Sequence, residues 1–373
     1  MASPASNSSP VASKGAPGPT QSGGPAENSR NSRVLVAGVG AVTALGNTAG
    51  ELWTGARNGR VAIEVVQGID MRGFGTKLGG QVSDLALHSP GDGEPFRERA
   101  LQLAQLAAQE AVAGLPPAIP AERRGLVLGT CNAGLLSARE WFRRDDAGET
   151  PDPQLLALVT PGGIADALAA TLNFAGPVLA VNTACASGAN AIGLAADLIR
   201  EDRADVVLAG GTDALSDIVF AGFSALEALS PLPAAPYSGN RQGLSLGEGS
   251  GMVLLVSARV AREHGLPVLA EIIGYGLSAD GYHPTAPRPD GSGAAQAMTA
   301  AMTAAGVGAA AVGYVNGHGT GTPKNDSAES FFGVPVPCPF TYPTAAALTP
   351  AAVIAAVMAR AAPLPSGRGA VGW

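Results

Sequence analysis

The chain has 373 residues, a formal net charge of −7 and 46% hydrophobic residues, so it can form a large core but lacks the basic surface typical of nucleic-acid-binding proteins. No uninterrupted run of 18 apolar residues occurs, which argues against a membrane protein and favours the cytoplasm. The three cysteines, Cys131, Cys185 and Cys338, lie far apart without C-x-x-C spacing, which argues against a disulfide scaffold or a zinc site.

Residues 1–33 contain 8 Ser, 5 Pro and 4 Gly and no apolar segment. This composition predicts a disordered tail, because such a segment cannot bury enough apolar surface to fold. A signal peptide would need a hydrophobic stretch that this segment lacks.

The first predicted strand, 33–46, runs into a glycine turn with the sequence "GVGAVTALG". Gly38 and Gly40 fit the start of a dinucleotide-binding loop, but Thr43 occupies the position of the third glycine. No acidic residue ends a following strand at the usual distance, so a nicotinamide-dependent enzyme is disfavoured.

Strands and helices alternate through the rest of the first half, which predicts an α/β fold. The predicted helices cover 97–114, 160–173 and 186–201, and the further strands cover 125–130, 178–182, 205–211 and 251–258.

Cys185 lies between the apolar run 178–181, read as a short buried strand, and the helical pattern that follows it. Small neighbours, including Ala184 and Gly188, leave room for a ligand. Unpaired N–H groups and the positive end of the helix dipole are expected to lower the pKa of this thiol, as in a catalytic nucleophile. A buried structural cysteine is the alternative that position alone leaves open.

The pattern then restarts: a strand and glycine turn at 268–281, a helix at 293–305 and a strand at 312–319. An overlay of the two halves places His318 roughly where the first half has Cys185, so the two residues are expected to share an active site. Further helices are predicted at 325–332 and 350–361.

His318 follows this last strand between two glycines, and Thr320 and Thr322 alternate after it, with their hydroxyls expected on one side of an extended segment. A histidine beside a cysteine can accept a proton or donate a hydrogen bond to an oxyanion or enolate. The alternative is a histidine buried in the core with its hydrogen bonds satisfied.

Five stretches between residues 33 and 330 together resemble the β-ketoacyl-ACP synthase family, which includes fatty-acid elongation enzymes and polyketide ketosynthases. They read "NTACASGANAIGLAADLI", "AGGTDALSDIVFAGFSALEALSP", "LSLGEGSGMVLLVS", "GYGLSADGYHPTAPRPDG" and "YVNGHGTGTPKND". The resemblance implies a thiolase-type, five-layered αβαβα fold of two pseudo-repeated halves. We therefore expect a tail at 1–33, an N-terminal half at 34–258, a partial C-terminal half at 259–336 and a divergent tail with one helix at 337–373.

The resemblance also implies roles for single residues. Cys185 matches the nucleophile that takes the acyl chain from acyl carrier protein, and His318 matches a histidine that assists decarboxylation of malonyl-ACP. Thr320 and Thr322 match the hydroxyls that hold the phosphopantetheine arm, and Asp326 and Glu329 match a supporting acidic pair.

The implied activity is decarboxylative condensation of acyl-ACP with malonyl-ACP in fatty acid or polyketide biosynthesis. The implied partners are acyl carrier protein and a second subunit, in a homodimer or a heterodimer with a related ketosynthase subunit. We expect neither a metal nor a bound cofactor, since the substrates are carried on the phosphopantetheine of the carrier protein.

The chain departs from the family pattern after Lys324. It has neither the stretch "K-x-x-x-G-H-x-x-G-A-A-G", with its lysine and second histidine, nor the later loop "G-F-G-G-x-N". Glu329 would then lack its usual lysine partner, and the oxyanion site would keep the Cys185 N–H but lose the donor of the glycine loop. These departures leave one alternative, a non-condensing or inactive ketosynthase-like partner subunit. A further alternative is a thiolase-like enzyme that uses coenzyme A, which shares the fold but lacks the "NGHGTGT" arrangement.

Overall fold

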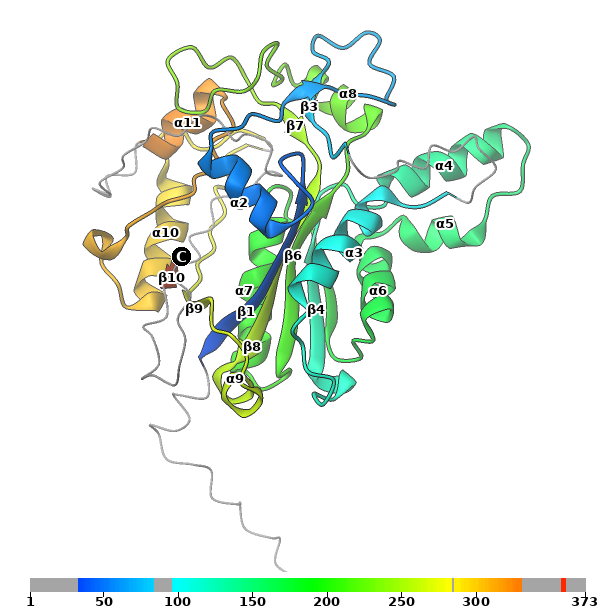
Figure 1. The fold of residues 1–373 in the computed structure, drawn as a ribbon. Helices are drawn as coiled ribbons and strands as arrows, with labels where there is room; N and C mark the ends of the chain where they lie inside the picture. The colour runs from blue at the N-terminus through cyan, green and yellow to red at the C-terminus, as the bar shows by residue number, and fades with distance from the viewer. Residues whose placement is uncertain (1–32, 84–95, 284, 331–356, 360–373) are drawn as a thin grey trace, which may run out of the picture.

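The computed structural model describes residues 33–83, 96–283, 285–330 and 357–359 (Figure 1). Its centre is a seven-stranded mixed sheet in the order β10-β9-β1-β8-β6-β4-β5. The pair β4–β5 and the pair β4–β6 are parallel, whereas all pairs from β6 to β10 are antiparallel. The strands are β1 (Val34–Thr43), β4 (Arg124–Gly129), β5 (Val178–Val181), β6 (Val206–Asp213), β8 (Gly249–Ser257), β9 (Ala270–Gly274) and β10 (Val357–Ala359).

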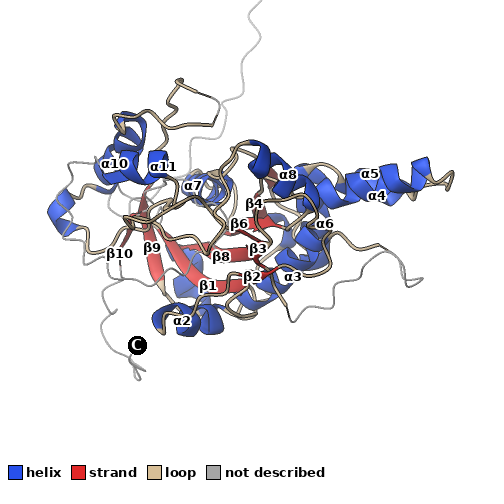
Figure 2. Cartoon of the chain, turned by 90° about the horizontal axis from the view of Figure 1, so that it is seen from above, coloured by secondary structure: helices blue, strands red, loops and turns tan. Residues whose placement is uncertain are grey.

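Helices cover both faces of this sheet (Figure 2). The helices α3 (Arg99–Ala111) and α6 (Pro161–Leu172) pack on one face, around a core that includes Leu103, Leu168 and Leu208. The helix α7 (Ser187–Arg200) packs on the other face, where its buried residues meet Val127, Val207 and Leu255. The sheet is therefore buried on both faces, which explains why its central strands are apolar throughout.

The glycines of β1 are explained by the packing of α3. A Cβ atom added to Gly38 would overlap the carbonyl oxygen of Ala111, and one added to Gly40 would overlap that of Ala107. Only glycine lets the helix backbone approach the strand this closely. These two glycines thus serve helix–strand packing, in agreement with the argument against a dinucleotide loop.

Smaller elements surround this core. The strands β2 (Glu64–Val65), β3 (Leu78–Gly80) and β7 (Leu246–Gly247) form a second, three-stranded sheet from the first half of the chain. The helices around the main sheet are α2 (Ala49–Arg57), α4 (Leu135–Asp146), α5 (Pro153–Leu158), α8 (Asp217–Ala225), α9 (Ala258–His264), α10 (Ser292–Ala305) and α11 (Pro323–Ser330), with 3₁₀ turns at Ala121–Arg123 and Ala309–Ala311. The helices α4 and α5 pack on each other and project from the body (Figure 1).

The α/β prediction with a central sheet is confirmed, and so are the predicted first-half strands and helices, apart from shifts of their ends. The prediction that 178–181 is buried is wrong: β5 is the edge strand of the sheet, and Leu179 is 36% exposed. An apolar run does not reveal whether a strand has neighbours on both sides or on one.

The second half differs more from the prediction. The strand β9 does not open a separate sheet but pairs antiparallel with β1. Residues 312–319, predicted as a strand, form no strand in the described structure. Within the predicted helix 350–361, Val357–Ala359 is a strand paired with β9, and the other residues of that range lie outside the described residues. Within the described residues, one seven-stranded sheet lies between helical layers, beside the separate three-stranded sheet, and the five-layered arrangement of two repeated halves stays a prediction.

The predicted tail at 1–33 lies outside the described residues except for Arg33, which pairs with Glu271. Most of 337–373 and Cys338 also lie outside them. Among the described helices, none is long and apolar enough to cross a membrane.

Candidate active site

Three chemically active side chains lie at the carboxyl edge of the parallel strands. Cys131 follows β4, Cys185 follows β5 after a short turn, and Asp213 ends β6. Because β4 is parallel to both β5 and β6, these ends share one edge of the sheet. Ligands in open α/β sheets bind at this edge, since the loops there converge on one crevice.

The turn that carries Cys185 is fixed by local hydrogen bonds. Ala184 has a φ of +54°, in the left-handed region that a side chain rarely adopts. The hydroxyl of Ser187 accepts a hydrogen bond from the backbone N–H of Thr183 (2.8 Å) and donates one to the carbonyl of Ala184 (2.6 Å). Asn190 donates to the hydroxyl of Thr183 over 2.6 Å. The half-buried Cys185 is thus held on a tight elbow two residues before α7.

The pKa of the Cys185 thiol is raised, in contrast to the expected lowering. Burial is the largest cause, the backbone N–H of Cys185 itself acts in the opposite direction, and the Asp213 carboxylate adds to the increase. Burial outweighs the backbone donor because removal from water penalises the thiolate directly. Cys131 behaves likewise: burial, Asp213 and Cys185 raise its pKa to about 11.

Asp213 is buried and holds the loop after β4. Its carboxylate accepts hydrogen bonds from the hydroxyl of Thr130 (2.7 Å) and from the backbone N–H groups of Cys131 (3.0 Å) and Asn132 (2.6 Å). Burial raises the pKa of Asp213, while these donors oppose the increase. Neither Asp213 nor Cys131 was singled out from the sequence as a site residue, although a polar residue that ends an apolar strand is the signal that could have found Asp213.

The second group of site residues lies around α11. Glu329 is buried and accepts hydrogen bonds from the backbone N–H groups of His318 (2.7 Å) and Gly319 (2.9 Å). It also accepts from the side chains of Tyr237 (2.7 Å) and Asn325 (2.9 Å). Among the described residues, Glu329 is therefore held by four uncharged donors.

Thr320 and Thr322 lie with their hydroxyls 2.8 Å apart. The segment is not extended as predicted, because Gly319 and Gly321 take φ values of +52° and +77° and curl the chain. Asp326, 1% exposed, stabilises this curl by accepting a hydrogen bond from the N–H of Gly321 (3.1 Å).

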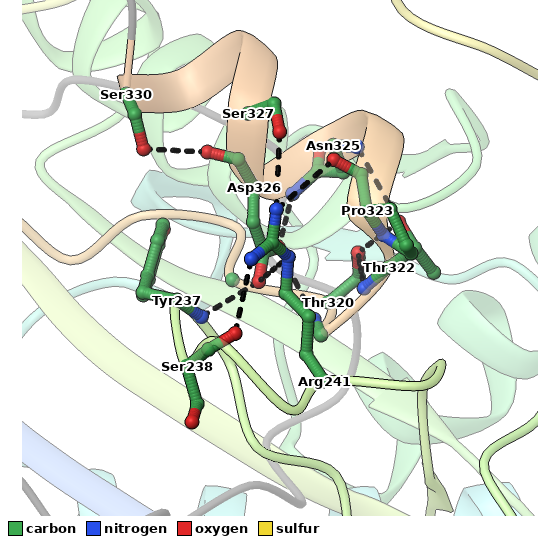
Figure 3. Close-up of polar contacts among 12 residues, drawn as sticks. Tyr237, Ser238, Arg241, Thr320, Thr322, Pro323, Asn325, Asp326, Ser327 and Ser330 are labelled. Atoms are coloured by element: carbon green, nitrogen blue, oxygen red, sulfur yellow. Dashed lines mark hydrogen bonds and ion pairs between the residues drawn. The ribbon is translucent and has the colours of Figure 1, made fainter.

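A loop of the first half braces α11, and sequence reasoning missed it (Figure 3). Tyr237 donates its backbone N–H to Asp326 over 2.7 Å. Arg241 donates to the hydroxyl of Ser327 over 3.0 Å and lies 3.7 Å from the Asp326 carboxylate. These pairs are separated by more than 80 residues in the chain, so no local pattern could have revealed them.

The two groups of side chains lie at the same end of the sheet. The bracing loop leads into β7 and β8, and Gly249, at the start of β8, pairs with Asp213 at the end of β6. The loop therefore joins the sheet at the edge that carries Cys131 and Cys185. In Figure 1, α11 accordingly lies at the same end of the molecule as α8 and β7. Within the described residues, no group of three or more His, Cys, Asp or Glu side chains is arranged to hold a metal ion.

Comparison with known families matches residues 31–261 to the N-terminal domain and residues 269–331 to the C-terminal domain of beta-ketoacyl synthase. The chain therefore belongs to the beta-ketoacyl synthase family, the condensing enzymes of fatty acid and polyketide synthesis. Among its relatives, it is similar to 3-oxoacyl-[acyl-carrier-protein] synthase 2 of Staphylococcus aureus (strain COL), with 33% identity over 311 residues, covering 80% of this chain and 75% of that protein.

Solved structures agree with this assignment. The ishigamide ketosynthase/chain length factor is similar with a TM-score of 0.73 and 31% identity, covering 87% of this chain and 82% of that one. A ketosynthase bound to a hexaketide, in complex with its type II polyketide synthase acyl-carrier protein, has a TM-score of 0.73 and 29% identity, covering 80% of this chain and 76% of that one.

Proposed function

We propose that the chain is a β-ketoacyl-[acyl-carrier-protein] synthase that condenses acyl-ACP with malonyl-ACP. The observation that carries this proposal is the shared edge of the sheet: the cysteine elbow after β5 and the His318 loop braced by the loop before β8 lie at one end of the molecule. A condensing enzyme needs such an arrangement, since the nucleophile and the group that stabilises the enolate must act on one substrate pair.

In the proposed first step, the Cys185 sulfur attacks the carbonyl carbon of acyl-ACP. The bond between this carbon and the carrier's sulfur breaks, and the carrier leaves as the free thiol with the proton from Cys185. In this proposal the backbone N–H of Cys185 donates a hydrogen bond to the oxyanion formed during this attack.

In the second step, malonyl-ACP loses its carboxylate as carbon dioxide, and the electron pair stays on the neighbouring carbon as an enolate. His318 donates a hydrogen bond to the enolate oxygen, and Thr320 and Thr322 hold the phosphopantetheine arm. The enolate carbon then attacks the Cys185 thioester, the carbon–sulfur bond breaks and β-ketoacyl-ACP forms. Cys185 recovers its proton from solvent.

A second subunit is proposed to cover the edge strand β5. Among the described strands, β5 has a sheet neighbour on one side only, and the side chains of Leu179 and Ala180 are exposed. An apolar edge of this kind pairs readily with another strand. This supports a homodimer, or a heterodimer with a related ketosynthase subunit.

One sequence observation favours a second candidate, a non-condensing partner subunit. The chain has no histidine after His318 and no "G-F-G-G-x-N" loop. Loss of one oxyanion donor costs on the order of 100-fold or more in rate. Such a subunit would still be acylated on Cys185, because acylation needs neither the decarboxylation of malonyl-ACP nor an enolate.

Incubation with acyl-ACP and malonyl-ACP, followed by mass spectrometry of protein and products, separates these candidates. A β-ketoacyl-ACP product supports the condensing enzyme, and an acylated Cys185 without product supports the non-condensing subunit. Reaction with coenzyme A thioesters but not with ACP thioesters would instead indicate a thiolase-like enzyme.

A further inference from the structure

We propose that Tyr237 is a positioning residue that holds the His318 loop in its active geometry by a hydrogen bond through Glu329. The role of His318 in this inference rests on the proposed function, whereas the hydrogen bonds between Tyr237, Glu329 and the loop are independent of it. It names a residue outside both motifs that carry the chemistry.

Tyr237 bridges both carboxylates of α11. Its backbone N–H donates to Asp326 over 2.7 Å, and its hydroxyl donates to Glu329 over 2.7 Å. One residue of the first half is thus bound to two buried acids of the second half. Hydrogen bonds to charged acceptors are about twice as strong as those between neutral groups.

Glu329 passes this constraint on to the loop. The same carboxylate accepts the backbone N–H groups of His318 (2.7 Å) and Gly319 (2.9 Å). The path from the Tyr237 hydroxyl to the backbone of His318 is therefore two hydrogen bonds long. If the hydroxyl is lost, the carboxylate loses its link to the first half of the chain, although Asn325 of its own helix still holds it.

The ring of Tyr237 also lies against the loop. A Cβ atom added to Gly317 would overlap the Tyr237 hydroxyl, and one added to Gly319 would come within 3.1 Å of the ring. The ring thus contacts the backbone on both sides of His318, and glycine at these two positions is what permits the approach. The side chain is 36% exposed, so one side of the ring faces solvent while the hydroxyl reaches the buried acid.

The backbone of Tyr237 is held in a conformation that tyrosine rarely adopts, with a φ of +60°. Such a conformation persists when its surroundings over-determine it. Here Arg241 supplies part of that constraint, since it donates to the carbonyl of Ser238 (3.0 Å) and to Ser327 of α11 (3.0 Å), as Figure 3 shows. Burial, followed by the charge of Glu329, raises the pKa of Tyr237, so its hydroxyl remains a donor at neutral and alkaline pH.

The test compares two partial reactions in Tyr237→Phe, which removes only the hydroxyl. We expect malonyl-ACP decarboxylation to fall by about 10-fold or more, as for loss of a hydrogen bond to a charged group. Acylation of Cys185 should stay within about twofold, because the elbow makes no use of Tyr237. The matched control is Tyr314→Phe on the His318 loop. Tyr314 is 65% exposed, and its substitution should leave both rates unchanged. Equal losses in both reactions would indicate general destabilisation and would overturn the proposal.

A second readout does not depend on the proposed function. Hydrogen exchange of a peptide covering residues 314–322 should be faster in Tyr237→Phe by about 10-fold or more, because the amides of His318 and Gly319 lose a rigid acceptor. Glu329→Gln should produce a similar change, and the double variant should add little to either. Unchanged exchange would refute the positioning role, whereas faster exchange without any decarboxylase activity in the wild type would refute only the proposed function.

Discussion

The ion pair between Arg99 and Glu248 provides the sharpest test of how the core is held. Glu248 is 1% exposed and accepts hydrogen bonds from Arg99 (2.6 and 2.7 Å) and from the backbone N–H groups of Val82 (2.9 Å) and Leu215 (3.2 Å). The substitution Glu248→Ala leaves a buried guanidinium without its counter-charge and two N–H groups without an acceptor. Removing one partner of a buried pair costs about 3–5 kcal/mol.

Because the entropy of unfolding is about 2.1 cal/mol/K per residue, a protein of this size loses roughly 1.5 °C per kcal/mol, and the melting temperature should fall by about 5–8 °C. The assay is thermal unfolding followed by circular dichroism. The control is Glu263→Ala, which removes an exposed Glu–Arg pair with Arg259 (2.8 Å) and should cost at most about 1 kcal/mol. If the melting temperature fell by the same small amount in both variants, the claim that the buried ion pair is needed for stability would be refuted.

Two further predictions concern the site and α7. The pKa of Cys185 is raised above its ordinary value of 9.0, so its thiolate forms only at higher pH. The rate of alkylation by iodoacetamide, measured by peptide mass spectrometry, should therefore keep rising above pH 9. A plateau of this rate near pH 8 would contradict the raised pKa. Gly193→Ala should lower the free energy of unfolding by about 1–3 kcal/mol, because the added Cβ overlaps the ring of Tyr275. Gly222→Ala in α8, where the added Cβ meets nothing within 4 Å, should raise the free energy of unfolding by up to about 1 kcal/mol. Both free energies are measured by denaturant unfolding, and a change of the same sign in the two glycine variants would refute this reasoning.

The sequence predicted best the elements whose local pattern alone determines them. The strands β1, β4, β6 and β8 are apolar runs because each has sheet neighbours on both sides and helices over both faces. The helix α7 was equally clear from the spacing of its buried residues. By contrast, α4 carries the strongly charged run "REWFRRDD", packs mainly on α5 and buries only Leu136, Ser137 and Glu140, so few apolar residues mark its buried side.

The failures share a physical cause, which is that pairing is not a local property. Residues 312–319 have the apolar character of a strand, but a strand exists only beside another strand, and none is described there. The same holds for the site. Cys185 and His318 could be found because each marks a junction in its own segment, whereas Tyr237 contacts Glu329 across 92 positions of the chain.

The pKa of Cys185 was predicted in the wrong direction for a related reason. The start of a helix can be predicted from sequence, whereas the burial that raises the pKa of the Cys185 thiol is set by the surrounding fold. The raised pKa favours the thiol form of Cys185 over the thiolate, and the proposed acylation must remove this proton.

A single-turnover transfer experiment tests the central claim most directly, namely that Cys185 and His318 act on one thioester. The protein is first acylated with labelled acyl-ACP and then mixed with malonyl-ACP, and the label on the Cys185 peptide is followed by mass spectrometry. The account predicts that the label leaves Cys185 and appears in β-ketoacyl-ACP, that Cys185→Ala is never labelled, and that His318→Ala is labelled but keeps its acyl group. Label on Cys131 in place of Cys185, or transfer at the wild-type rate in His318→Ala, would contradict it.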